Sequence, residues 1–265
     1  TIASQIFSFI DYNTKRASVD LAMWKGSFPA RAGHEAESNK FFRRICEERA
    51  HAEGVHPACD YLGLADDIEK YGIRNSNTTT EAPTGTLSII ADTSGGCEPV
   101  FALAFKRFQA DEHMIDVDPV FAARLRQMYV DQGRFSSAEI DDMVDLDFNV
   151  IDANHGSLVG LPSKCDFPQD VFKTAHDITP EEHVNVQAAF QRFNDSAVSK
   201  TINFAESATV ADVEKAYLLA YKLGCKGITV YRNNSRKFQP LSVSEAPAAA
   251  ELAVTVPQAP APKEK

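Results

Sequence analysis

Five consecutive residues, Pro83-Thr84-Gly85-Thr86-Leu87, carry the groups that can bind a phosphate without a lysine. The proline fixes the start of a turn, the glycine lets the backbone approach a ligand closely, and the threonines supply two hydroxyls. Backbone amides left free in such a turn, together with the hydroxyls, can wrap a phosphate. An ordinary turn before a buried segment is the alternative, because such turns are common. Phosphate binding here is therefore a hypothesis that the rest of the sequence has to support.

Two Glu-x-x-His pairs, Glu48 with His51 and Glu53 with His56, have a spacing found in carboxylate-bridged metal sites. Those sites take their pairs from separate helices. Here both pairs lie in one stretch, which Gly54 interrupts, so we expect a solvated, charged helix end and no metal site. A metal protein that uses these pairs is kept as an alternative.

The five cysteines of the chain are widely scattered, and no Cys-x-x-Cys pair occurs. This pattern argues against a disulfide framework or a zinc knuckle and favours a reducing compartment such as the cytoplasm. Cys165 could act in a Cys–His hydrolase only if the fold brought His155 or His176 close to it. Spacing alone gives that arrangement little support.

The bulk properties are those of a globular protein, with 265 residues, of which 44% are hydrophobic and 24% charged. A formal net charge of −10 argues against a broad grip on the backbone of a nucleic acid. No apolar run approaches the ~20 residues that span a bilayer, and no signal peptide opens the chain. We therefore expect no nucleic-acid or membrane partner and a cytoplasmic location. Because the chain opens on Thr1 rather than methionine, we expect a fragment or a processed piece.

Apolar spacing and capping signals predict the elements that must position the candidate residues. Helices are expected over 2–24, 38–53 and 60–71, before the Pro-Thr-Gly-Thr turn. The segment 101–108 is apolar and could form a strand or a helix. Four capping signals then predict the start of one helix each: Asp118-Pro119, Ser136, Thr179 and Thr209.

Residues 201–204 and 227–231 have the composition of strands and flank the helix expected behind Thr209. Strand, helix, strand is the unit that builds a parallel sheet. Core-facing stripes are expected on the last two helices, the first made of Val186, Phe190, Phe193 and Ala197 and the second including Tyr217 and Tyr221. Alanine and proline dominate the end of the chain, so we expect a folded part over 1–240 and a flexible tail over 241–265.

The candidate phosphate loop is followed by Ser94-Gly95-Gly96-Cys97-Glu98-Pro99, and the two segments together resemble the substrate-phosphate loop and the next motif of ribonucleotide reductase large chains. The Ala-Pro-Thr-Gly-Thr wording is most similar to class II, the adenosylcobalamin-dependent branch. Further similar stretches occur in the family's order and cover most of residues 15–236: residues 16–29, 174–178, 187–191, 197–204, 216–221 and 223–232. A lone Thr-Gly-Thr is a weak signal, whereas the ordered series is a strong one.

The resemblance implies an α/β fold, the C-terminal portion of the ten-stranded α/β barrel of this family. It implies an oxidoreductase that reduces ribonucleotides to deoxyribonucleotides by thiyl-radical chemistry started from adenosylcobalamin. Pro83, Thr84, Gly85, Thr86 and Leu87 would hold the substrate phosphate. The implied partners are the ribonucleotide, an external dithiol reductant such as thioredoxin, the remaining N-terminal part of the enzyme and, because the family often dimerises, a second copy.

The chain departs from the family in lacking Asn-x-Cys-x-Glu, the finger-loop motif whose cysteine abstracts the ribose 3′-hydrogen. That loop and the reducing cysteines would lie upstream, so we expect no catalytic residue here and no activity from the fragment alone. Cys97 and Glu98 cannot replace the motif, because adjacent side chains of an extended loop point to opposite sides. A small buried thiol is expected at Cys97. Glu98-Pro99 matches the family and either anchors the loop or lies near the substrate.

Tyr231-Arg232 ends the last predicted strand, where reductases that receive a radical from a second subunit have two stacked tyrosines. Arg232 removes that relay and favours the cobalamin branch. A fragment of a class I-like large chain, and a non-catalytic nucleotide- or phosphate-binding module that kept the loop, are the alternatives.

Overall fold

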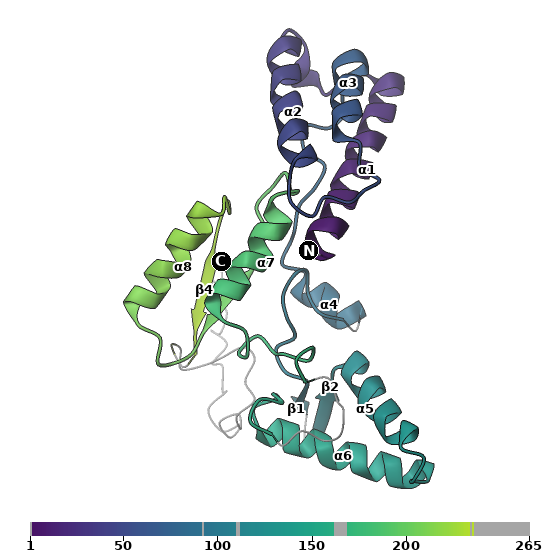
Figure 1. The fold of residues 1–265 in the computed structure, drawn as a ribbon, viewed down its shortest axis with the longest axis vertical. Helices are drawn as coiled ribbons and strands as arrows, with labels where there is room; N and C mark the ends of the chain where they lie inside the picture. The colour runs from purple at the N-terminus through teal and green to yellow at the C-terminus, as the bar shows by residue number, and fades with distance from the viewer. Residues whose placement is uncertain (1, 92, 110–111, 162–168, 234, 236–265) are drawn as a thin grey trace, which may run out of the picture.

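The computed structural model describes residues 2–91, 93–109, 112–161, 169–233 and 235. In this part of the chain, three groups of elements follow one another along an elongated molecule (Figure 1). A helical bundle lies at one end, two helices with two strands lie in the middle, and a hairpin with two helices lies at the other end. Each group has its own cluster of buried apolar side chains.

Three helices form the bundle: α1 (Ile2–Lys25), α2 (Glu35–Ala50) and α3 (Tyr61–Tyr71). A 3₁₀ turn, η1 (Pro29–Arg31), links the first two. The three helices predicted in this region are confirmed. The bundle core also takes in Phe193 from beyond the end of the later helix α7, so the first and last thirds of the described chain share apolar contacts.

The middle group contains α7 (Pro180–Gln191), β3 (Thr201–Phe204), α8 (Val210–Lys222) and β4 (Thr229–Arg232). The two strands pair in parallel, with Thr201 opposite Thr229, which confirms the predicted strand–helix–strand unit. Helix α7 begins with a capping box at Thr179, and α8 with one at Thr209. These capping signals therefore predicted both helix starts correctly.

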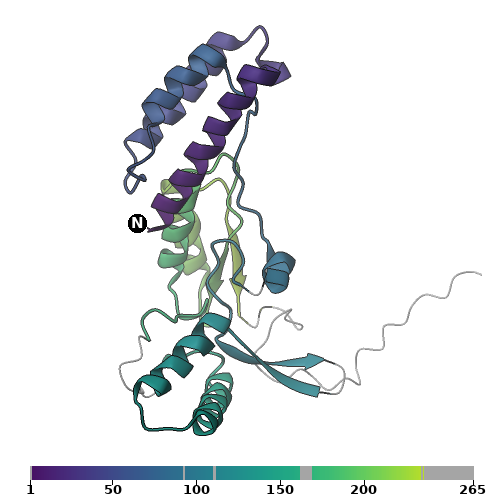
Figure 2. The same cartoon turned by 90° about the vertical axis from the view of Figure 1, so that its right-hand side faces the viewer.

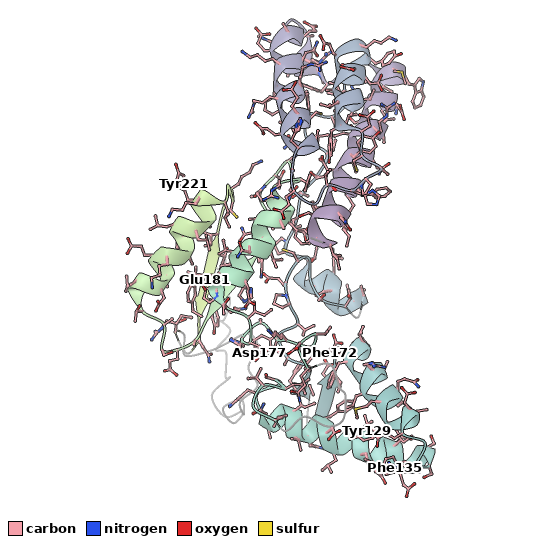
Figure 3. All side chains as sticks on the ribbon, in the orientation of Figure 1. Tyr129, Phe135, Phe172, Asp177, Glu181 and Tyr221 are labelled. Atoms are coloured by element: carbon pink, nitrogen blue, oxygen red, sulfur yellow. The ribbon has the colours of Figure 1, made fainter. Side chains whose placement is uncertain are left out.

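The stripe predicted for α7 is confirmed only in part: Phe193 is fully buried and Phe190 packs against the bundle core, whereas Val186 and Ala197 are exposed. Val186 is 40% exposed, while His183, Gln187 and Gln191 are buried. Polar side chains occupy this face because they bond to the backbone of neighbouring segments: Gln187 Nε2 donates to the carbonyl of Gly227 at 2.7 Å. The prediction that two tyrosines of α8 face the core is also wrong, since Tyr217 is exposed and so is Tyr221 (Figure 3).

The third group contains the hairpin of β1 (Ala104–Gln109) and β2 (Glu112–Val117), followed by α5 (Pro119–Asp131) and α6 (Ser137–Ala153). The strands pair antiparallel, and Figure 2 shows the hairpin projecting from the long axis of the molecule. The ambiguous segment 101–108 thus contributes a strand. Strand β2 was not predicted, and α6 is longer than a short helix because its apolar face continues to Ile151 in the core.

The described residues form a mixed α/β structure with two sheets of two strands each, and these sheets do not close into a barrel. One further parallel bridge joins Glu81 to Val198. The tail expected over 241–265 lies outside the described residues. Within the residues described, no helix is long and apolar enough to cross a membrane.

Candidate functional site

The segment Pro83–Leu87 lies on the connection between the bundle and the hairpin group, at the start of the short helix α4 (Gly85–Ala91) (Figure 1). Thr84 is the residue before this helix, and its carbonyl oxygen accepts the first helical hydrogen bond, from Ser88 N at 2.8 Å. The amides of a first helical turn have no acceptor within the helix. The amides of residues 85–87 are therefore available to a ligand in this geometry.

This loop is open to solvent rather than covered by its own side chains. Pro83, Gly85 and Thr86 are exposed, and Leu87 is 63% exposed. One group within the loop is different: Thr84 Oγ1 is buried and has no hydrogen-bond partner among the described residues. A buried hydroxyl without a partner is costly, so an acceptor brought in by a ligand would satisfy it.

The glycine-rich segment that follows α4 packs directly against the loop. A Cβ atom on Gly95 would lie 3.4 Å from the carbonyl oxygen of Pro83 and 3.5 Å from Thr84 Oγ1. Gly96 has a φ of +50°, and a Cβ there would lie 2.7 Å from Glu81 Oε1. At Gly96 a side chain would be strained by the positive φ and would have to displace the Glu81 carboxylate, whereas a Cβ at Gly95 would make ordinary contacts.

Glu98 ends this second loop and is anchored by strand β3. Its Oε2 accepts a hydrogen bond from Lys200 Nζ at 2.9 Å, and its Oε1 accepts one from the amide of Thr201 at 2.6 Å. Lys200 is 2% exposed. A buried ammonium needs a counter-charge, and Glu98 supplies it. The geometry therefore assigns an anchoring contact to Glu98.

Lys200 also donates to His183 of α7, with Nζ 2.8 Å from Nδ1. The other ring nitrogen, Nε2, lies 3.0 Å from the carbonyl oxygen of Ala175. Because a carbonyl only accepts, Nε2 carries the proton and Nδ1 accepts from Lys200. Burial, and then the positive charge of Lys200, lower the pKa of His183 and keep the imidazole neutral.

The chain that leads into the phosphate loop is held by the segment before β3. Ser199 N donates to the carbonyl of Glu81 at 3.0 Å, and Ser196 N donates to the carbonyl of Thr79 at 3.2 Å. Together with the Glu81–Val198 bridge, these bonds make residues 79–81 a short extended strand beside residues 196–199.

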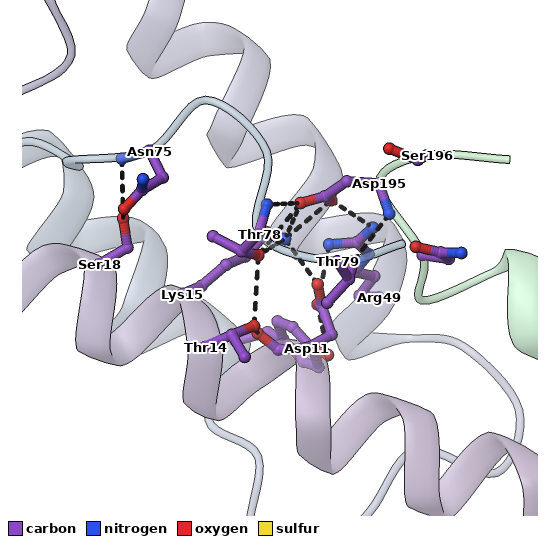
Figure 4. Close-up of polar contacts among 12 residues, drawn as sticks. Asp11, Thr14, Lys15, Ser18, Arg49, Asn75, Thr78, Thr79, Asp195 and Ser196 are labelled. Atoms are coloured by element: carbon purple, nitrogen blue, oxygen red, sulfur yellow. Dashed lines mark hydrogen bonds and ion pairs between the residues drawn. The ribbon is translucent and has the colours of Figure 1, made fainter. Parts of the chain in front are cut away.

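A buried ionic cluster stands behind this strand (Figure 4). Lys15 Nζ lies 2.6 Å from Asp11 and 2.7 Å from Asp195, and Arg49 contacts the same two carboxylates. Asp195 also accepts from the amide of Thr78 at 2.9 Å. Burial raises the pKa of Asp195, but the charge and hydrogen bond of Lys15 and the bond from Thr78 outweigh it and lower the pKa to about 2.

A cavity of about 650 Å³ is lined in part by Glu98 and Pro99. Phe172 contributes an aromatic wall from the segment that leads towards α7 (Figure 3). Two of its carboxylates, Asp118 and Glu182, already accept hydrogen bonds at the starts of α5 and α7. The lining contains neither histidine nor cysteine.

The remaining sequence candidates do not form a site in the described residues. Cys97 is half-buried, and burial raises its pKa to about 12, so it is a neutral thiol at physiological pH. Glu48 pairs with Arg44 of its own helix, and no group of three metal-ligating side chains occurs in the part of the chain described. Cys165 lies outside the described residues. Arg232 donates to the backbone carbonyl of Glu206 at 2.6 Å.

Sequence reasoning did not single out Lys200, which donates to the anchoring carboxylate of Glu98, or His183, which accepts from Lys200. A lysine directly before a predicted strand is expected to be exposed, and the burial of Lys200 is evident only from the tertiary structure. The histidine lay in a helix whose apolar stripe was assigned to other positions.

Comparison with known proteins gives a consistent set of similarities. The ribonucleotide reductase barrel-domain family matches residues 1–231. A vitamin B12-dependent ribonucleoside-diphosphate reductase of Thermoplasma acidophilum is 39% identical over 213 residues, which cover 79% of this chain and 25% of the relative. The corresponding reductase of Mycobacterium tuberculosis strain H37Rv is 41% identical over 202 residues, covering 76% and 26%. A vitamin B12-dependent ribonucleotide reductase of Streptomyces clavuligerus is 31% identical over 256 residues, covering 91% and 26%. The chain spans about a quarter of the length of these relatives.

Proposed function

The chain belongs to the ribonucleotide reductase barrel-domain family, and from this we propose that it supplies the substrate-phosphate loop of a B12-dependent reductase that converts ribonucleotides to deoxyribonucleotides. The relatives that it matches over most of its length carry that activity in their names. Arg232, in place of a second tyrosine after Tyr231, supports the cobalamin branch over the two-subunit branch.

The observation that carries this proposal is the Thr84 hydroxyl, buried without a partner in an otherwise open loop. In the proposed role, the amides of residues 85–87 and the hydroxyls of Thr84 and Thr86 donate to the phosphate oxygens, and Pro83 and Leu87 frame the turn. The loop binds and orients the anionic end of the substrate. It does no bond-breaking chemistry itself.

The hydrogen-abstracting thiol belongs to the remaining N-terminal part of the enzyme in this proposal. Cys97 lies nearest to the loop in sequence, but its position directly beside Glu98, rather than two residues from a glutamate, does not match the finger-loop motif. The parallel β3–α8–β4 unit and the Glu81–Val198 bridge are proposed as pieces of the ten-stranded barrel, completed by the rest of the chain. An external dithiol such as thioredoxin, a second copy and a cytoplasmic location complete the proposal.

Adenosylcobalamin is the proposed source of the radical. The cavity lined by Glu98 and Pro99 has no histidine or cysteine in its lining, so the residues there do not fit coordination to cobalt. We therefore assign no residue of this chain to the cofactor and no step of the loop's action to it.

The test uses the full-length reductase that contains this segment, with adenosylcobalamin and a dithiol. Thr84→Val keeps the β-branched shape and removes the hydroxyl, so the KM for a ribonucleoside diphosphate should rise on the order of tenfold, as for a lost hydrogen bond to a charged group. Thr229→Val, on an exposed residue of β4 outside residues 82–97, is the matched control and should leave KM unchanged.

The 265-residue chain assayed by itself should form no deoxyribonucleotide, because it lacks the finger-loop cysteine. Failure of the full-length enzyme to form deoxyribonucleotide would reject the reductase assignment. An unchanged KM in Thr84→Val would reject the phosphate role of the loop.

A further inference from the structure

Both ends of the phosphate-loop region are fastened to one short segment. On the incoming side, Ser196 and Ser199 donate to the carbonyls of Thr79 and Glu81. On the outgoing side, the carboxylate of Glu98 receives Lys200 Nζ and the amide of Thr201. Residues 82–97 therefore form a loop whose two ends are both attached to residues 196–201.

The incoming side is held by backbone bonds, which any side chains would permit. The outgoing side depends on side chains, because Glu98 reaches the segment only through its carboxylate. The position of the second loop, and of Gly95 against Thr84, therefore depends on the Glu98 carboxylate, which is held by the ion pair with Lys200 and by the amide of Thr201. The contacts of Glu98 are therefore the part of this attachment that depends on particular side chains.

Each of the three N–H donors of the Lys200 ammonium has an acceptor. Its three N–H donors face Glu98 Oε2 at 2.9 Å, His183 Nδ1 at 2.8 Å and the carbonyl of Thr201 at 3.3 Å. With three acceptors converging on it and 2% exposure, the ammonium has one orientation. The strand β3 and helix α7 thereby fix the place of Glu98.

We propose that Lys200 is a positioning residue for substrate binding, which acts through Glu98 to hold the Ser94–Glu98 loop against Thr84 and so shapes the phosphate loop. This inference rests on the proposed function of residues 83–87. Lys200 itself does not contact the phosphate, because its ammonium donates its three hydrogen bonds to acceptors within the protein. It affects the positions of the Thr84 hydroxyl and of the amides of residues 85–87, which contact the phosphate in the proposed function.

The experiment measures steady-state kinetics of the full-length reductase with a ribonucleoside diphosphate. Lys200→Met should raise KM on the order of tenfold, as for loss of one charge-assisted hydrogen bond, with kcat within about twofold of the wild type. Glu98→Gln should give a similar rise. In the double variant the two effects should not add, because both changes break the same pair.

Ile202→Val is the matched control, because Ile202 is fully buried in β3, next in the chain to the anchored Thr201, and belongs to the apolar cluster of the middle group. It should lower thermal stability and leave KM unchanged. A variant that is merely destabilised loses active enzyme and therefore kcat, whereas a misplaced loop changes KM.

An unchanged KM in Lys200→Met, or additive effects in the double variant, would overturn the positioning role while leaving the phosphate loop itself intact. If Lys200→Met does not fold, Glu98→Gln alone decides, since Glu98 is partly exposed. A wild-type enzyme that forms no deoxyribonucleotide would instead reject the proposed function, and the inference with it.

Discussion

His183 illustrates how a single buried side chain can hold one protonation state. It is 1% exposed, it donates from Nε2 to a carbonyl, and its Nδ1 faces the ammonium of Lys200. A second proton, on Nδ1, would remove the acceptor of Lys200 and place two positive charges together. The folded protein therefore resists protonation of this ring more than the unfolded chain does.

This predicts a pH dependence of stability. The pKa of His183 is lowered from the ordinary value of 6.5, so below about that pH the unfolded chain takes up a proton that the folded chain refuses. The free energy of unfolding should be independent of this group above pH 6.5 and should fall as the pH drops towards the lowered pKa. Urea denaturation of the protein between pH 5 and 8 measures the slope.

His183→Gln should reduce that slope, because glutamine can donate to the carbonyl and accept from Lys200 without titrating. His176 is half-buried and its pKa is also lowered by burial, so part of the slope should remain in the single variant. His34→Gln, at an exposed site, should keep the slope. An identical slope in His183→Gln and the unmodified protein would contradict the assignment.

Residue-level chemistry was predictable from the sequence only where it is local. The Pro83–Leu87 turn is a contiguous motif, and the structure has it exposed at the start of a helix. Lys200 and Glu98 are far apart in the sequence, so their pairing depends on a tertiary contact that neither local pattern contains. The phosphate role of the loop stays a prediction.

At the scale of elements, hydrogen-bond caps fix where the helices start. The Thr179 side chain accepts from the amide of Glu182, and the Glu182 carboxylate accepts from the amide of Thr179 in return. The helix so started, α7, carries His183 to Lys200 and contributes Val184 to the middle core. The cap therefore supports both the packing and the anchor.

Thr179→Ala should lower the free energy of unfolding by about 1 kcal/mol, the usual cost of losing an N-cap side chain. Chemical denaturation followed by circular dichroism measures this difference. Thr93→Ala removes an exposed threonine that caps no described helix and should change stability by less than about 0.5 kcal/mol. Equal effects of the two substitutions would argue against the cap as the source.

Helix starts were predictable because capping is a signal within four residues, as at Asp118, Ser136, Thr179 and Thr209. Strand β2 was not, because its pairing with β1 is decided across a hairpin and half of its residues are polar. The buried face of α7 was misjudged for a related reason. Glutamines there bond to backbone groups that only the folded chain brings near.

At the scale of the whole molecule, the ionic cluster joins segments that lie far apart in the sequence. Asp11 and Lys15 come from α1, Arg49 from α2, and Asp195 from the segment beyond α7. Two acids and two bases balance one another in a site where water is excluded (Figure 4). The cluster thus ties the bundle to the segment that clamps the phosphate loop.

Lys15→Met should lower the free energy of unfolding by about 3–5 kcal/mol, because it leaves two buried carboxylates with a single cation. Arg43→Met is the control: Arg43 pairs with Asp66 and Glu69 on the surface, and its loss should lower stability far less than Lys15→Met does, because solvent screens exposed ion pairs. Denaturant titrations of both variants give the two values. A small effect of Lys15→Met would show that the cluster is not a structural tie.

Thr84 holds a φ of +47°, a left-handed conformation that is unfavourable for a β-branched residue and free of strain for glycine. The chain thus tolerates a cost of roughly 1–3 kcal/mol at the one position in the loop whose hydroxyl is buried and unpaired. A ligand that accepts from this hydroxyl would find it already oriented, with the entropy of ordering spent during folding. The strained conformation would then lower the stability of the folded protein and raise its affinity for the ligand. A loop without this strain would be more stable and would bind the ligand more weakly.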